Sequence, residues 1–162
     1  MPASATAGLA VTAHAAALLN SSTFTDVSLA TLSAWSSWQY QNFTAAQLAD
    51  ANISGPAADA NGDGLKNVLA YAFASSPWAN LTGALPTSSV QGGYLTTTFV
   101  RRKPPTDLLY AVQVSADLAT WATATTETAV TSLDATTELV TIRDNVPSGG
   151  QIKRFIRVRV TQ

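Results

Sequence analysis

Residues 108–115 read LLYAVQVS, and this stretch decides the fold class. The large apolar residues recur at every second position, and smaller or polar residues stand between them. The apolar set comprises Leu108, Tyr110, Val112 and Val114. Because successive side chains of a strand point to opposite sides, this period of two predicts a β-strand with one buried face.

The same period recurs toward the C-terminus. In residues 155–160, Ile156, Val158 and Val160 alternate with Phe155, Arg157 and Arg159. Three more strands are expected at residues 94–101, 120–130 and 138–143, and turn residues separate them at 104–105, 134 and 147–150. Five or more short antiparallel strands predict a mainly β domain, an immunoglobulin- or fibronectin-like β-sandwich, over residues 81–162.

Residues 28–80 follow a helical period instead. A helix is expected over 28–43 with Ser28 as its N-cap, a short turn over 45–49 capped by Thr44, and a second helix over 65–74. Gly, Pro, Asn and Asp are frequent in 51–64, which predicts a loop there. A small helical part therefore precedes the predicted sandwich.

Composition narrows the class of protein. Charged residues make up 12% of the 162 residues, the formal net charge is −1, and the chain has no cysteine. The net charge argues against a general nucleic-acid binder, and the absence of cysteine excludes disulfides and thiolate metal sites. The basic residues at 101–103 and 153–159 are expected to be solvated and charge-paired, with Arg157 and Arg159 near Glu138 or Asp144.

Residues 1–27 form a third segment, with no charge before Asp26. The segment lacks the basic start of a signal peptide, and its alanine-rich stretch is too weakly apolar to insert into a membrane. Residues 9–15 alternate as a strand would, which favours addition to the sheet of a neighbouring copy. The alternatives are that the segment pairs within its own chain or frays.

One loop carries recognisable chemistry. Residues 59–67 read DANGDGLKN and place oxygen side chains at loop positions 1, 3, 5 and 9, with glycine at position 6. The candidate metal ligands are Asp59, Asn61, Asp63, the carbonyl of Leu65, and Asn67. This spacing resembles an EF-hand loop and suits a hard cation, for which calcium is the natural choice.

Position 12 of the loop departs from that pattern. An EF-hand has a bidentate carboxylate there, whereas this chain has Ala70. Calcium binding is therefore expected to be weak, with a dissociation constant of about 0.1–1 mM, or lost. The alternative is a turn in which Asp59 or Asp63 accepts backbone N–H bonds and caps the helix that follows.

The order of these motifs resembles a C-terminal region common in large exported, autotransporter-like or adhesin-like proteins of Verrucomicrobia and related bacteria. The matching stretches are FTAAQLAD at 43–50, DANGDGLKNVLAYA at 59–72, DLLYAVQVSADLATW at 107–121 and RFIRVRV at 154–160. The resemblance covers residues 35–161 and includes a loop similar to dockerin and thrombospondin calcium loops. It implies a non-catalytic surface module with a calcium-loop helix pair. The family usually has acids at the positions of Asn61 and Ala70 and a glycine near Ala74.

Two functions compete in this interpretation. The expected one is an extracellular or cell-surface structural module for adhesion, anchoring or self-assembly, such as a subunit of a filament or coat, whose partner is another copy or a surface protein. The alternative is a carbohydrate-binding accessory module, with Trp78 as its best exposed aromatic residue because Trp78 follows Pro77 in a loop. Catalysis is not expected, because the single histidine, His14, has no acidic partner nearby in the sequence.

Overall fold

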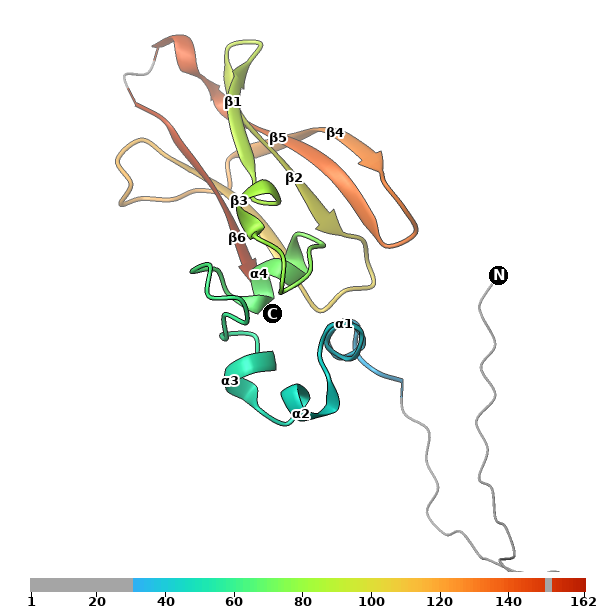
Figure 1. Cartoon of the computed structure of the whole chain (residues 1–162). Coiled ribbons are helices and arrows are strands. Elements are labelled where there is room, and N and C mark those ends of the chain that lie inside the picture. The colour runs from blue at the N-terminus through green and yellow to red at the C-terminus, as the bar shows by residue number, and fades with distance from the viewer. Residues whose placement is uncertain (1–30, 151–152) are drawn as a thin grey trace, which may run out of the picture. The chain divides into compact units, whose positions relative to one another are not determined.

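The computed structural model describes residues 31–150 and 153–162. The chain divides into two units, residues 1–31 and 32–162, and every described element belongs to the second. The helices are α1 (Ala34–Asn42), α2 (Ala45–Leu48), α3 (Ala51–Ser54), α4 (Asn67–Ala72), η1 (Leu81–Gly83) and η2 (Ser148–Gly150). The strands are β1 (Thr87–Gln91), β2 (Tyr94–Arg102), β3 (Leu109–Ser115), β4 (Thr125–Ser132), β5 (Thr137–Pro147) and β6 (Phe155–Thr161) (Figure 1).

The described part of the chain is mainly β, as the alternating pattern predicts. Its strands form two antiparallel sheets, a four-stranded one in the order β1-β2-β5-β4 and a two-stranded one of β3 and β6. Val112 and Val114 of β3 are buried, whereas Leu109 is 74% exposed, which confirms the predicted inner face. Ser115, expected on the outer face, is also buried. Opposite Val112 lies Val158 of β6.

A hydrophobic core fills the space between the two sheets. Phe99, Val140 and Ile142 from the four-stranded sheet pack with Val112 from the two-stranded sheet. Phe73, which follows α4, enters the same cluster and meets Phe99 edge to face, with ring centroids 6.2 Å apart. The core is therefore shared between the sheets and the helical part.

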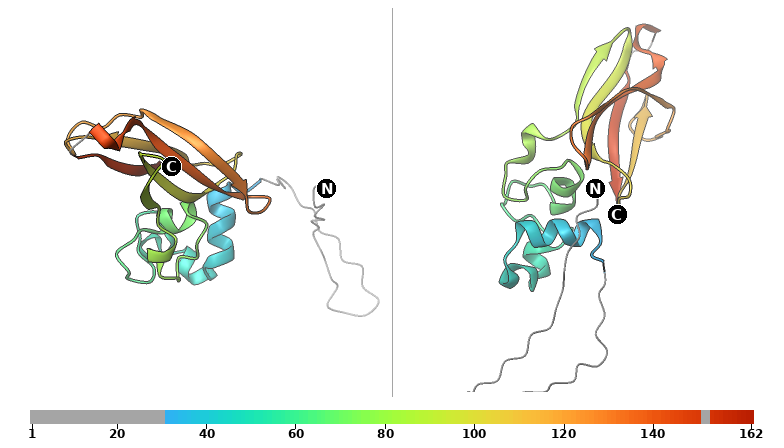
Figure 2. Two further views of the ribbon diagram at one scale, coloured as in Figure 1. Left: turned by 90° about the horizontal axis from the view of Figure 1, so that it is seen from above. Right: turned by 90° about the vertical axis from the view of Figure 1, so that its right-hand side faces the viewer.

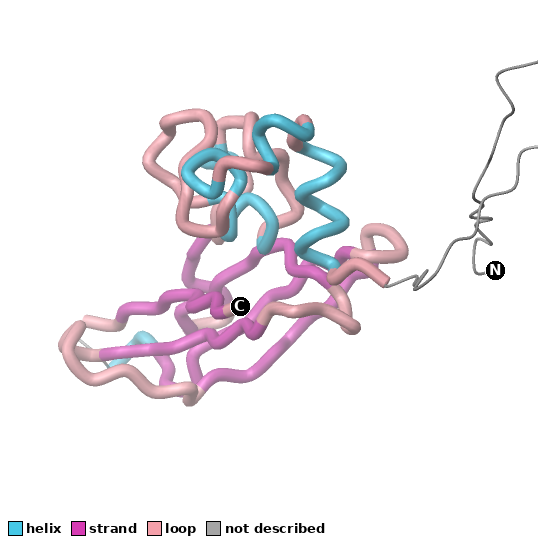
Figure 3. The backbone as a smooth tube through the Cα atoms, turned by 90° about the horizontal axis from the view of Figure 1, so that it is seen from below, coloured by secondary structure: helices cyan, strands magenta, loops and turns pink. Residues whose placement is uncertain are grey.

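Helices α1 to α4 and their loops gather at one end of the strands (Figures 2 and 3). Helix α1 begins at Ala34, because the hydroxyl of Ser33 accepts a bond from the backbone N–H of Ser36. The prediction of Ser28 as N-cap is therefore wrong. Helix α2 begins as predicted, with Thr44 and Gln47 forming a reciprocal capping box.

Helix α4 is shorter than the predicted 65–74. Lys66 still has an extended backbone, and Ala74 takes a left-handed conformation with φ of 56° after the helix ends. The N–H of Ser75 reaches back to the carbonyl of Ala70 at 2.8 Å, which closes the helix with a Schellman-type turn. The helix buries Tyr71 completely, against Trp35 and other aromatic side chains.

The strands differ from the expectation in three places: β1 is an additional strand, β4 begins later, and β5 extends to Pro147 instead of residue 143. Strand β1 was not predicted, because TSSVQ lacks apolar alternation and all five residues are exposed. It pairs with β2 through Gly92 and Gly93, whose positive φ angles of 55° and 81° suit a tight hairpin. Strand β4 begins at Thr125 instead of residue 120, because residues 117–120 form a turn closed by Asp117.

Within the described ranges, no helix combines the length and apolar character that crossing a membrane requires.

Candidate functional site

The aspartate loop closes on its own backbone. One carboxylate oxygen of Asp59 accepts the N–H of Gly62 at 2.8 Å and that of Asp63 at 3.2 Å, and the other accepts the N–H of Gly64 at 2.8 Å. Gly62 and Gly64 have φ angles of 73° and 86°, which favour glycine. The carboxylate accepts backbone N–H groups, as the second interpretation of the sequence expects. The expected capping of the following helix is wrong, because these bonds close the loop itself and the N-cap of α4, Lys66, has no side-chain capping bond.

Asp63 and Asn61 tie this loop to the segment before β1. Asp63 accepts the N–H of Leu65 at 2.9 Å with one oxygen and the N–H of Leu81 at 3.0 Å with the other. The amide of Asn61 donates to the carbonyl of Ala79 at 2.8 Å. The bonds from Leu81 and Leu65 hold the pKa of the Asp63 carboxyl below its ordinary value. The loop is therefore a junction between two segments 18 residues apart.

The structure separates the predicted ligands into two groups. Asp59, Asn61 and Asp63 lie together, whereas Asn67 is only 1% exposed and its amide donates to the carbonyls of Ile53 and Gly55. Ala70 at position 12 is completely buried in the core. The backbone N–H of Leu65 is taken by Asp63.

The donor set is a poor fit to a full calcium cage. Three clustered oxygen side chains already accept backbone N–H groups, and a six- to eight-oxygen shell would need further ligands. In the described part of the chain, no group of three or more His, Cys, Asp or Glu residues is placed to hold a metal ion.

Trp78 lies in a fixed orientation at the surface. The side chain is 43% exposed, and its indole N–H donates to the carbonyl of Asn42 at 2.8 Å. Its ring meets Phe43 at a centroid distance of 5.5 Å and an interplanar angle of 63°. A partly exposed, fixed aromatic ring is a surface on which an apolar ligand face can stack.

A second polar cluster, which sequence reasoning missed, joins the helical part to the sheets. The carboxylate of Asp107, in the loop between β2 and β3, accepts the hydroxyl of Tyr71 at 2.6 Å and the backbone N–H of Trp35 at 3.0 Å. Asp107 thus caps α1 from 72 residues away. Burial, followed by the bond to Asp107, raises the pKa of Tyr71.

Arg102 and Tyr110 complete this junction. The guanidinium of Arg102 lies over the ring of Tyr71, 4.1 Å from its centroid, and donates to the carbonyl of Tyr71 at 2.6 Å. The hydroxyl of Tyr110 donates to the carbonyl of Ala72 at 2.6 Å. Burial lowers the pKa of Arg102 and raises that of Tyr110. These polar groups hold the end of α4 against β2 and β3, so their role is structural.

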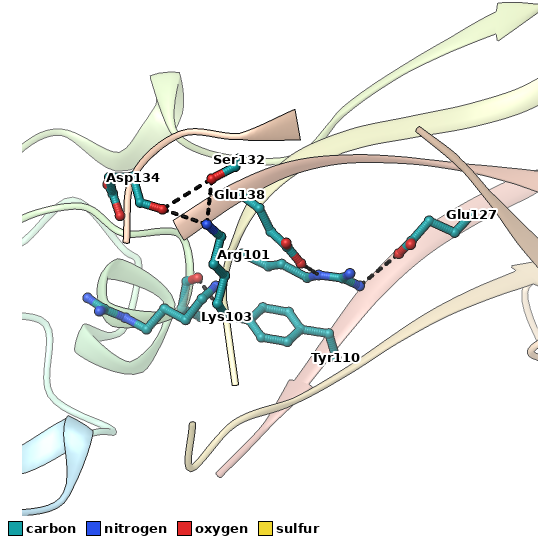
Figure 4. A network of polar contacts seen from close by, with 9 residues as sticks. Arg101, Lys103, Tyr110, Glu127, Ser132, Asp134 and Glu138 are labelled. Carbon is teal, nitrogen blue, oxygen red and sulfur yellow. Dashed lines mark hydrogen bonds and ion pairs between the residues drawn. The ribbon is translucent and has the colours of Figure 1, made fainter. Parts of the chain in front are cut away.

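The basic residues at 101–103 include the charge pairing that the sequence predicts, although it did not indicate their partners. Arg101 lies between Glu127 and Glu138, and Lys103 donates to the hydroxyl of Ser132 (Figure 4). Residues from three strands, β2, β4 and β5, therefore share one charged network.

The predicted pairing of Arg157 with Glu138 or Asp144 is wrong. Asp144 is completely buried and instead receives two bonds from Arg154, at 2.6 and 2.7 Å. Arg157 donates to Gln113 and lies over the ring of Trp121, 3.9 Å from its centroid. The reason is register: β6 pairs with β3, so its outward side chains meet β3 and the turn beside it.

The sheets leave two core-facing side chains uncovered. Val90 of β1 is opposite Leu95, on the same side of the sheet as Phe99, yet it is 62% exposed. Val130 of β4 is opposite the buried Val140 and is 47% exposed. Both lie on the outer strands of the four-stranded sheet, which a two-stranded sheet is too narrow to cover.

Comparison of this chain with protein-family models, with curated proteins and with solved structures gave no match.

Proposed function

We propose that this chain is a non-catalytic structural and interaction module of an extracellular or cell-surface protein. In this proposal the two sheets make an immunoglobulin- or fibronectin-like β-sandwich, and the helical part with its EF-hand-like loop braces one end. The module serves adhesion, anchoring or self-assembly, with another copy or a surface protein as its partner. The uncovered outer strands of the four-stranded sheet carry this proposal.

The outer strands support an interaction role through their lack of charge. Strand β1 has no charged residue, and Glu127 is the single charged residue of β4. Natural monomeric proteins protect exposed edge strands with charges, prolines or covering elements, because free backbone groups otherwise pair with other chains. An uncharged edge beside an exposed core-facing valine is suited to pairing with another strand.

The use of the polar side chains supports a non-catalytic role. Asp59, Asp63 and Asp107 each accept backbone N–H groups, and Asp144 is buried against Arg154. Groups committed to structural bonds in this way stabilise turns and junctions. His14 and the alternating residues 9–15 lie outside the described residues.

Calcium remains part of the proposal as a weak ligand at most. The three clustered side chains, Asp59, Asn61 and Asp63, would supply oxygen ligands, and water would have to provide much of the rest. The loop is already closed by hydrogen bonds, so the fold is expected to form without calcium.

Sedimentation velocity of the full chain over about a hundredfold range of concentration tests the self-assembly role. The expected result is a mass that rises with concentration and depends on residues 1–20, so that their removal leaves a monomer. A full chain that stays monomeric throughout would overturn self-assembly.

Carbohydrate binding is the second candidate, favoured by the exposure and fixed orientation of Trp78. Calorimetry of the full chain with a glycan panel tests it, with the Trp78→Ala variant beside the parent. Heat of binding that is lost in the variant would favour this candidate, and no heat with any glycan would refute it.

A further inference from the structure

Within residues 31–150 and 153–162, strand β6 has one paired edge and one edge without a partner strand, here called the open edge. Among the described residues its ladder partner is β3, with Val114 opposite Ile156. The N–H and C=O of Val114 bond instead to Ala122, on the far side of β3. Because antiparallel pairs alternate between bonded and unbonded positions, Ile156, Val158 and Val160 direct their backbone groups away from β3.

The open edge lies on the side of the sheets where Val90 is uncovered. Strand β3 lies beside β4 and is bridged to Ala122, whereas β6 lies against β2. Strand β1 is the next strand beyond β2 and carries Val90 on its core-facing side. One more strand beside β6, about 4.8 Å away, would lie across from β1 and cover Val90.

We propose that residues 8–15 of a second copy of this chain add to the open edge of β6 as a strand. This inference rests on the proposed self-assembly and identifies its donor and acceptor. The segment reads GLAVTAHA, so Leu9, Val11, Ala13 and Ala15 share one face. Eight residues match the seven residues of β6.

Charge and polarity fit the same arrangement. Ile156, Val158 and Val160 pack toward the core, so the neighbouring strand must also present an apolar face inward. Arg157 and Arg159 are exposed on the outward face, where a cationic donor strand would be repelled. The outward residues of the donor, including Thr12 and His14, carry no positive charge at neutral pH.

The arrangement predicts an open assembly. Each chain offers one donor segment and one acceptor edge, which are different surfaces. Such head-to-tail contacts produce filaments unless their rotation closes a ring. The backbone bonds supply affinity, and the alternating apolar side chains supply register.

A matched pair of full-length variants tests the donor. Val11→Glu places a carboxylate on the inward face, and Thr12→Glu places the same group on the outward face beside the arginines. Because burying an unpaired carboxylate is costly, Val11→Glu is expected to weaken association about tenfold or more, while Thr12→Glu associates as the parent does. Equal association of both variants, with the parent still assembling, would overturn this inference and leave the proposed function standing.

A second pair tests the acceptor. Val90→Glu changes the side chain that the donor would cover, and Ser89→Glu adds the same charge on the opposite face of β1. Both positions are exposed, so both variants should fold. Weaker assembly is expected from Val90→Glu alone, and an unchanged mass in that variant would refute the proposed position.

Hydrogen exchange of the backbone amides of Ile156, Val158 and Val160, which point away from β3, separates a second copy from the chain's own segment. Protection that rises with protein concentration and is lost in Val11→Glu is the expected result. Protection in a monomer would identify residues 8–15 of the same chain as the occupant and overturn assembly through this edge. A monomer without protection would overturn the inference and the self-assembly role together.

Discussion

Asp107→Ala removes the side chain that joins the helical part to the sheets. The carboxylate accepts the hydroxyl of Tyr71 at 2.6 Å and the N–H of Trp35 at 3.0 Å. A hydrogen bond to a charged group contributes about 1.5–3 kcal/mol, and a lost N-terminal helix cap costs about 0.5–2 kcal/mol. Since Tyr71 is completely buried, its hydroxyl would lose a partner in the variant. We expect a loss of about 3 kcal/mol in the free energy of unfolding.

Urea denaturation followed by tryptophan fluorescence measures this loss, because Trp35 contacts Tyr71 directly. For a domain of this size, about 3 kcal/mol corresponds to a melting temperature lower by about 6–12 °C. Asp117→Ala is the matched control, because Asp117 accepts the N–H groups of Ala119 and Thr120 within one exposed turn. The control should lose clearly less stability than Asp107→Ala, because its turn is exposed to water.

A double-mutant cycle with Tyr71→Phe isolates the bond to the hydroxyl. The coupling energy between positions 71 and 107 is expected to be about 1–2 kcal/mol. If Asp107→Ala cost no more than Asp117→Ala, or if the coupling were zero, the assignment of Asp107 as the joining residue would be refuted.

Three further predictions concern backbone strain, pH and calcium. Ala74→Gly should raise the free energy of unfolding by about 0.5–1 kcal/mol in thermal melts, because the φ angle of Ala74 is 56°, which strains a residue with a side chain. The control Ala72→Gly, within α4, should lower the free energy of unfolding. A lower free energy of unfolding in Ala74→Gly would contradict the strain. Since burial raises the pKa of Tyr71, the folded state keeps its proton longer than the unfolded state, whose tyrosines titrate near pH 10. The contribution of Tyr71 to the free energy of unfolding is therefore fully present below about pH 10 and decreases as the pH rises above that value. In urea melts from about pH 9 to 11, Tyr71→Phe should reduce the slope of the free energy of unfolding against pH. An unchanged slope would argue against this role of Tyr71. If the dissociation constant for calcium is about 0.1–1 mM, calcium at about 10 mM should raise the free energy of unfolding by no more than about 3 kcal/mol. Asp59→Asn should abolish this increase. Stabilisation at micromolar calcium would refute weak binding.

In the helical part, the sequence predicts those contacts whose partners lie within a few residues of each other. The capping box of Thr44 and Gln47 lies within four residues, so the sequence predicts its geometry directly. The turn formed by residues 59–64 is equally local, since Asp59 accepts N–H groups three to five residues ahead. The N-cap of α1 was misplaced because several serines precede that helix, and local pattern does not choose among them.

The long-range contacts had no comparable signal. Asp107 caps a helix 72 residues away. Asn67, which the sequence predicts as a metal ligand, is buried, and its side-chain amide donates to the carbonyls of Ile53 and Gly55. Strand β1 has no apolar period, so its pairing with β2 depends on the hairpin and on the register of a neighbour. Neither the composition nor the spacing of these residues indicates such partners.

The sequence by itself determined the mainly β class, the inner faces of β3 and β6, and the oxygen-rich turn, because each follows from periods or bonds spanning a few residues. Tertiary structure alone decided the strand order, the partners of Arg101 and Arg154, and the uncovered face beside β6. These depend on which distant strands pair and in what register, and that choice reflects the burial of the whole core rather than the preference of any one segment.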